Sequence, residues 1–72
     1  MQNLYKVYVV EYATNQGWKG IGEDGHSLSH DLFKMKVFTD YMKALDWKGT
    51  MDSEHFSSYR VSTYTVTAYK EE

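Results

Sequence analysis

The sequence predicts an α+β fold class: a small antiparallel or mixed sheet with a single amphipathic helix packed on one face, in the order β-β-α-β. Two long segments near the ends of the chain are rich in Tyr, Val and Thr, which is the composition of strands. Between them, apolar residues recur at the spacing of a helix. The 72 residues suffice for a single domain, 1–72, with a core of modest size.

The first part of the sheet is predicted from residues 4–21. Residues 4–13 (LYKVYVVEYA) form a long strand in which neither face is fully polar. Residues 14–17 (TNQG) are turn formers, so residues 18–21 are expected to return as a short second strand paired with the first. The glycine-rich stretch at 20–25 then predicts a loop.

The middle of the chain predicts an amphipathic helix over about residues 31–48. The apolar residues of its central window fall within about half of the helical wheel: Met35, Val37, Phe38, Tyr41, Met42, Ala44 and Leu45. The other side is polar and of mixed charge, with Lys36, Thr39, Asp40, Lys43 and Asp46. Ser29 is expected to cap the N-terminus, with Asp31 near the positive end of the helix dipole. Gly49 is expected to cap the C-terminus.

The last strand is predicted over residues 58–70 (SYRVSTYTVTAYK), after a polar loop at 50–57. The helix is expected to cover the more aliphatic positions of the sheet: Val7, Val9, Tyr64, Val66 and Ala68. That arrangement leaves the other face open, with four tyrosines among threonines: Tyr8, Tyr12, Tyr59 and Tyr69. If the first and last strands are neighbours, a direct crossover between them is expected to be parallel and right-handed.

Composition argues against several classes of function. The chain has 8 basic and 10 acidic residues and a net charge of -2, whereas nucleic-acid-binding domains usually carry a basic stripe. It has no Cys, which removes disulfides, thiolate nucleophiles and Cys-ligated zinc. We find no signal peptide and no apolar run long enough to span a bilayer, so a cytoplasmic protein without a membrane role is expected.

Two motifs that could bind ligands have simpler interpretations. Residues 20–25 (GIGEDG) match the G-x-G-x-x-G pattern of dinucleotide-binding folds, but Glu23 and Asp24 would repel a phosphate there. His26 and His30 are four residues apart and could begin a zinc site, yet no third ligand follows at a recognisable spacing. We therefore expect a surface loop with surface histidines, and neither a cofactor nor a metal.

The tyrosines carry the functional hypothesis, because Tyr is enriched at protein interfaces. With no visible pairing of nucleophile and base, the sequence favours a non-enzymatic protein-binding module, a regulator or inhibitor that masks a partner's surface. In size and character the chain is in the general style of small phage or mobile-element accessory proteins, including anti-defence inhibitors, although no motif matches. The expected protein-binding residues are Tyr8, Tyr12, Tyr59 and Tyr69, together with Glu23 and Asp24, which would steer a basic partner.

Two other classes of function stay open. In the first, the tyrosines stack on nucleic-acid bases while Lys6, Arg60 and Lys70 touch phosphates. In the second, His26 and His30 serve a small enzyme or metal protein. We also expect a homodimer, formed through the open sheet face or a strand edge. If the tyrosines prove to be core, the alternative working surface is the polar side of the helix: Lys36, Asp40 and Lys43.

Overall fold

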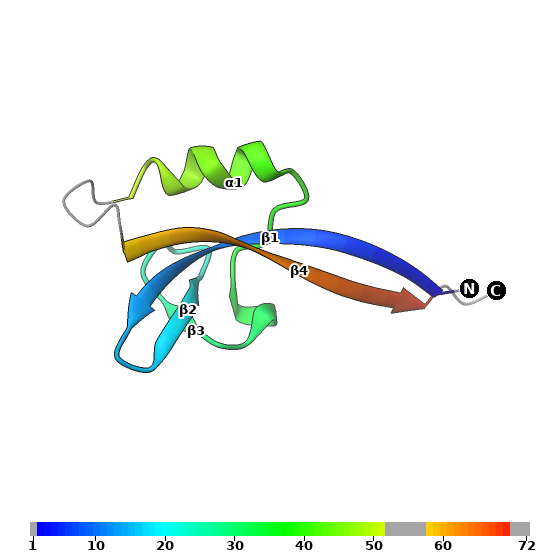
Figure 1. Ribbon diagram of the computed structural model, residues 1–72, viewed down its shortest axis with the longest axis horizontal. Helices are drawn as coiled ribbons and strands as arrows, with labels where there is room; N and C mark the ends of the chain where they lie inside the picture. The colour runs from blue at the N-terminus through cyan, green and yellow to red at the C-terminus, as the bar shows by residue number, and fades with distance from the viewer. Residues whose placement is uncertain (1, 52–57, 70–72) are drawn as a thin grey trace.

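The computed structural model describes the backbone of residues 2–51 and 58–69, and the side chains of residues 4–51 and 58–67. Its elements are, in chain order, β1 (Gln2–Thr14), β2 (Gly17–Ile21), β3 (Leu28–Ser29), the 3-10 helix η1 (Leu32–Lys34), the α-helix α1 (Tyr41–Lys48) and β4 (Tyr59–Tyr69) (Figure 1). The strands form one antiparallel sheet in the order β3-β2-β1-β4, and α1 lies against the two long strands. The predicted α+β class, with a helix on a small sheet, is confirmed. The predicted order β-β-α-β is right only in part, because it lacks β3 and η1.

β1 and β2 form a hairpin at the turn that the sequence predicted. Thr14 pairs with Gly17 around a turn at Asn15 and Gln16. Gly17 has a φ of +95°, a backbone conformation that residues with side chains rarely adopt, so glycine suits this position. The Thr14 hydroxyl donates to the Gly17 carbonyl at 2.6 Å and accepts from the Gln16 N–H at 3.1 Å, which fixes the turn.

β4 pairs with β1 in one unbroken register, in which Tyr8 faces Thr63. The pairing is antiparallel, so the predicted parallel crossover is wrong. The reason lies before α1: Phe38 exchanges two backbone hydrogen bonds of 2.8 Å with Tyr8, which brings the chain back to the middle of β1. From there α1 runs in the direction of β1, so β4 begins near the far end of β1 and returns (Figure 1).

The predicted helix over 31–48 is confirmed only in its last part. Asp31 caps η1 and Asp40 caps α1, each by accepting a hydrogen bond from the backbone N–H two residues later. Between the two caps, the N–H groups of Lys36 and Phe38 donate to carbonyls of β2 and β1. Because the sheet engages these backbone groups, the segment cannot be helical despite its helical pattern of apolar residues.

The two predicted ends of the helix have different outcomes. Ser29 lies in β3, and its hydroxyl accepts from the Asp31 N–H at 2.9 Å instead of capping an α-helix. Gly49 does cap the C-terminus, with its N–H donating to the Leu45 carbonyl at 3.0 Å. The position of the C-cap is therefore predicted correctly, although Gly49 keeps a right-handed φ of -64° that does not require glycine.

The two long strands present two faces. The tyrosine face carries Tyr8, Val10, Tyr12, Tyr59, Val61 and Thr63, and the glutamate face carries Val7, Val9, Glu11, Arg60, Ser62 and Tyr64. α1 packs on the tyrosine face, since the rings of Tyr8 and Tyr41 meet edge to face with centroids 5.5 Å apart. The expectation that α1 covers the glutamate face is therefore wrong. The chain enters α1 beside Tyr8, and this entry point selects the face.

Met35 packs on the glutamate face, where the helix was expected. Gly20 pairs with Glu11 across the sheet, so a Cβ at Gly20 would point toward that face. Such an atom would lie 2.1 Å from the Met35 sulfur, so the missing side chain of Gly20 is what admits Met35. Met35 is buried as predicted, but it precedes the helix instead of belonging to it.

Among the described residues, the buried apolar side chains come from both faces: Val7, Val9, Val10, Ile21, Met35 and Ala44. On α1 the buried residue is Ala44, and Leu45 is half-buried. Tyr41 and Met42 are 46% and 61% exposed, so the predicted apolar stripe is only partly in contact with the sheet. Within the residues described, no helix has the length and apolarity that crossing a membrane requires.

Candidate functional site

A shallow hollow lies between two tyrosines and the glycine-rich loop. Tyr12 and Tyr59 face each other across β1 and β4, with ring centroids 5.0 Å apart. Their rings form one wall of a shallow, solvent-open hollow of about 230 Å³. Among the described residues, its lining is Tyr12, Ile21, Gly25, His26, Leu28 and Tyr59. Strand pairing thus joins two tyrosines that are far apart in the sequence.

The loop that forms the other wall is held by its own hydrogen bonds. The Asp24 carboxylate accepts from the backbone N–H groups of His26 at 2.9 Å and Ser27 at 2.8 Å, and from the Ser27 hydroxyl at 2.5 Å. The Gly22 N–H donates to the Ser27 carbonyl at 2.8 Å. These hydrogen bonds, led by that of the Ser27 hydroxyl, lower the pKa of Asp24 to about 2. The loop therefore keeps a fixed shape and a negative charge at neutral pH.

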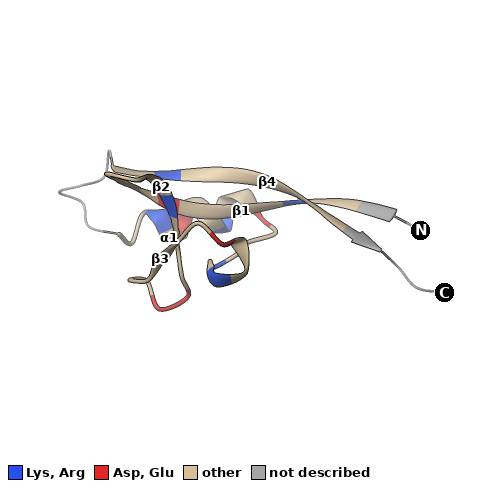
Figure 2. Cartoon of the chain, turned by 90° about the horizontal axis from the view of Figure 1, so that it is seen from below, with Lys and Arg blue, Asp and Glu red and all other residues tan. Residues whose placement is uncertain are grey.

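Acidic charge gathers beside the hollow. Glu23 and Asp24 are both exposed on the loop between β2 and β3, which is coloured red in Figure 2. The sequence assigned both residues a steering role. The structure adds a second role for Asp24, whose carboxylate folds the loop.

The structure gathers most of the predicted binding residues, but in two groups. The register places Tyr8, Tyr12 and Tyr59 on one face, as the sequence predicted. Tyr69 stands an even number of residues from Tyr59 along β4, so its register position belongs to the same face. Tyr12 and Tyr59 line the hollow, whereas Tyr8 contacts Tyr41 of the helix, so the tyrosine face is not open throughout. The side chain of Tyr69 lies outside the described residues.

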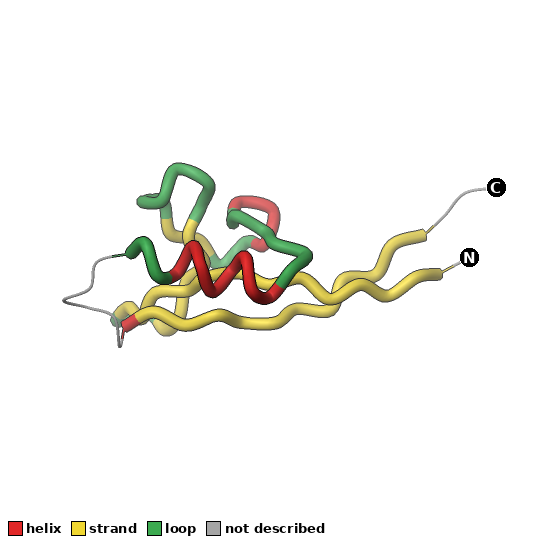
Figure 3. Tube along the Cα trace, turned by 90° about the horizontal axis from the view of Figure 1, so that it is seen from above, coloured by secondary structure: helices red, strands yellow, loops and turns green. Residues whose placement is uncertain are grey.

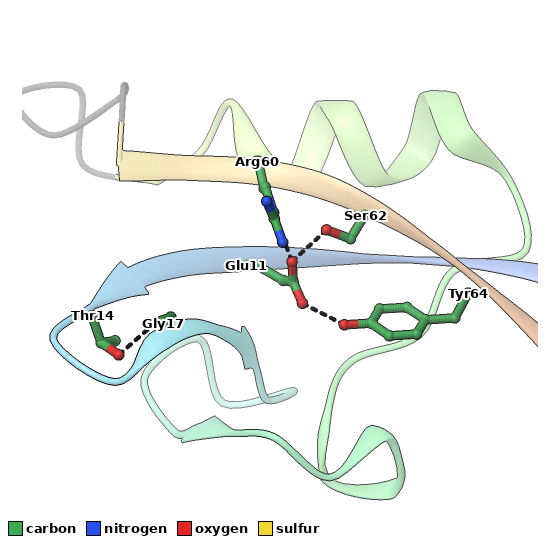
Figure 4. A network of polar contacts seen from close by, with 6 residues as sticks. All are labelled: Glu11, Thr14, Gly17, Arg60, Ser62 and Tyr64. Carbon is green, nitrogen blue, oxygen red and sulfur yellow. Dashed lines mark hydrogen bonds and ion pairs between the residues drawn. The ribbon is translucent and has the colours of Figure 1, made fainter.

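A polar network on the glutamate face was not identified from the sequence (Figure 4). Glu11 is 2% exposed and accepts from the Arg60 Nε–H at 2.8 Å, from the Tyr64 hydroxyl at 2.5 Å and from the Ser62 hydroxyl. The three donors alternate along β4, so they share one face opposite a carboxylate of β1. That spacing of donors at 60, 62 and 64 is the signal that sequence reasoning could have used.

The network sets the ionisation of its members. Burial alone raises the pKa of Glu11, but hydrogen bonds from Ser62, Tyr64 and Arg60 outweigh burial and hold that pKa below its ordinary value of 4.5. The hydrogen bond to Glu11, together with burial, raises the pKa of Tyr64 to about 12. A low-pKa carboxylate whose oxygens are engaged by three donors is suited to joining β1 to β4 and poorly suited to proton transfer.

Arg60 makes internal contacts, although its side chain is 48% exposed. Its guanidinium lies 4.2 Å from the centroid of the Trp18 ring while it pairs with Glu11. The nucleic-acid hypothesis uses Arg60 together with Lys6 on β1 and Lys70, and Lys70 lies outside the described residues. The cation expected to contact phosphate at Arg60 is therefore already paired.

The structure also places the other candidate sites that were considered from the sequence. Across residues 2–51 and 58–69, no group of three or more His, Asp or Glu is arranged to hold a metal ion, and His26 and His30 lie on loops. The glycine-rich motif at 20–25 leads from β2 into a turn and then β3, whereas a dinucleotide site needs a helix there. Lys36 was expected on the polar side of the helix, but it lies before α1. Its Nζ is 5.2 Å from the centroid of the Phe38 ring.

Comparison of this chain with protein-family models, curated proteins and solved structures found no match. The function proposed below therefore rests on geometry and charge.

Proposed function

We propose that this chain is a non-enzymatic protein-binding module, a regulator or inhibitor that masks the surface of a partner protein. The hollow between the tyrosine pair and the glycine-rich loop receives one side chain of that partner. The observation that carries the proposal is the direct pairing of Tyr12 with Tyr59 beside a loop that presents two exposed carboxylates. Aromatic residues of this kind are the usual energetic anchors of protein interfaces.

The size of the hollow favours a protein side chain over a free small molecule. Its volume of about 230 Å³ is below the ~300–1,000 Å³ typical of small-molecule sites. Its lining combines the apolar side chains of Ile21 and Leu28 with the phenol groups and the His26 imidazole. An apolar or aromatic side chain with a polar tip suits such a lining.

The charge beside the hollow indicates the character of the partner. Glu23 and Asp24 are exposed, and the low pKa of Asp24 keeps its carboxylate ionised. A partner surface with Lys or Arg around the inserted side chain would complement these charges. Such complementarity mainly raises the association rate and makes that rate sensitive to salt.

The proposal is tested by capture from the chain's own cellular context, with the bound proteins identified by mass spectrometry. Tyr59→Ala removes one wall of the hollow, and we expect it to lose the stoichiometric partner that the parent captures. Truncation of an interface anchor weakens binding by ~1–4 kcal/mol, or about fivefold to a thousandfold in Kd, so the captured fraction should fall. Tyr5→Ala is the matched control, because Tyr5 is 51% exposed on β1 and lies outside the lining.

Thermal melting of each variant separates loss of binding from loss of folding. Equal capture by the parent, Tyr59→Ala and Tyr5→Ala would contradict the proposal. Capture of nucleic acid that falls steeply with added salt would instead support the stacking hypothesis.

A further inference from the structure

The outer side of β4 is an open strand edge. β4 stands last in the sheet order β3-β2-β1-β4, so within the described part of the chain no strand pairs with its other side. The strand is 11 residues long, and its register with β1 is unbroken, without a bulge. A long unbroken edge of this kind offers a row of backbone donors and acceptors to another strand.

Strand alternation identifies which backbone groups face outward. Tyr8 exchanges its two hydrogen bonds with Phe38, on the side of β1 away from β4. Tyr8 and Thr63 are therefore a non-hydrogen-bonded pair, and the N–H and C=O of Thr63 point to the outer edge. With the two-residue period of a strand, the outward set is Val61, Thr63, Thr65 and Thr67. The three threonine side chains are exposed.

This edge lacks the usual protection against pairing. Natural edge strands are guarded by charged side chains, proline, bulges or a covering element. The chain contains no Pro, and Arg60 is the charged residue of β4. Arg60 lies at one end of the strand, where it contacts Glu11 and Trp18. Residues 61–67, which follow it along the strand, carry no charge.

The outer half of the long hairpin also needs a third strand. Residues 2–7 of β1 pair only with residues 64–69 of β4 among the described residues, and the two strands extend beyond α1 as a ribbon (Figure 3). Leu4 is 67% exposed and Tyr5 is 51% exposed on this ribbon. A two-stranded ribbon is marginally stable in water, whereas three or more strands are stable.

We propose that the β4 strands of two copies of this chain pair antiparallel about a twofold axis through Tyr64, joining the two sheets into one. In this register Thr63 faces Thr65 of the second copy, and Val61 faces Thr67. Each of these pairs exchanges two backbone hydrogen bonds. A second copy fits this edge because the neutral segment meets itself without like-charge repulsion. The same contact also covers both ribbons, since each lies beside the first half of the other β4.

This dimer uses the outer edge of β4 instead of the hollow, although Tyr59 belongs both to β4 and to the hollow's wall, and it holds whether or not the proposed function does. The first test needs no substitution. At high micromolar concentration the parent should show twice its 8.5 kDa mass by light scattering. Amide hydrogen exchange at Val61, Thr63, Thr65 and Thr67 should slow by about tenfold or more relative to dilute protein.

The amide of Ser62 provides an internal control, because it faces β1 outside the ribbon and should be protected at both concentrations. A monomeric mass at high concentration would overturn the proposal. A dimer in which the four outward amides still exchange rapidly would overturn it equally.

A charge exchange tests the register. In Thr63→Glu/Thr65→Glu, two glutamates face two glutamates of the second copy, so we expect a folded monomer. In Thr63→Lys/Thr65→Glu, each lysine faces a glutamate, so the dimer should return. Both variants carry the same Thr65→Glu substitution opposite Lys6 of β1, so the two monomers are matched at that position. If both variants dimerise, or neither does, the proposed pairing is wrong.

Discussion

Glu11 shows how one buried charge can join two neighbouring strands that are far apart in the sequence. A lone buried carboxylate is strongly destabilising, but three donors from β4 compensate for the water that Glu11 loses. Arg60 is in turn held against the Trp18 ring of β2, so the network connects three neighbouring strands. The alternation of donors along β4 also marks the register, because a shift of one residue would turn all three to the other face.

The lowered pKa of Glu11 predicts a pH dependence of stability. Folding favours the ionised form, so the contribution of Glu11 is complete above the ordinary pKa of 4.5 and is lost as the pH falls through the lower folded-state pKa. We expect the unfolding free energy of the parent to decrease below about pH 5. In Glu11→Gln the decrease should be smaller, because that side chain does not titrate.

Urea unfolding at several pH values from neutral to acidic measures this difference. Glu23→Gln is the control, since Glu23 is exposed and its substitution should leave the slope as in the parent. A slope in Glu11→Gln equal to that of the parent would show that folding does not lower the pKa of Glu11.

At the scale of elements, α1 shows what helical periodicity can and cannot establish. The apolar spacing across 35–46 is that of a helix, but only the part from Tyr41 onward is helical. The backbone of Lys36 and Phe38 bonds to the sheet, and no local pattern reveals such long-range hydrogen bonds. The turn before Gly17 was predictable because neighbouring residues determine it. The two long strands were predictable because their composition is strongly β-like over many residues.

Contact between α1 and the sheet depends on Ala44. Ala44 has no exposed surface, whereas the neighbouring Met42 is 61% exposed. Ala44→Asp would place an unpaired carboxylate in the core and should lower the unfolding free energy by ~3 kcal/mol or more, which a small domain cannot tolerate. Met42→Asp introduces the same side chain into the first turn of the same helix, and should change stability by less than about 1 kcal/mol.

Thermal unfolding monitored by circular dichroism compares the two substitutions. Loss of the cooperative transition in Ala44→Asp alone is the expected result. Equal melting of the two variants would mean that α1 does not pack through Ala44.

At the scale of the whole molecule, the structure separates two surfaces that the sequence combined. The sequence placed all four binding tyrosines on one open face, but α1 occupies part of that face at Tyr8. The hollow at Tyr12 and Tyr59 remains, and β4 adds an open edge. The side chosen by α1 could not be predicted, because it follows from the entry of the chain beside Tyr8 and from the packing of Met35 against Gly20.

The central claim is that the hollow receives a partner protein. Its most direct test is an NMR titration of isotope-labelled chain with the captured partner, following each backbone amide. We expect the largest chemical-shift changes at the residues that line the hollow: Tyr12, Ile21, Gly25, His26, Leu28 and Tyr59. Changes centred instead on the polar side of the helical region, at Lys36, Asp40 and Lys43, with the lining residues unaffected, would contradict the account.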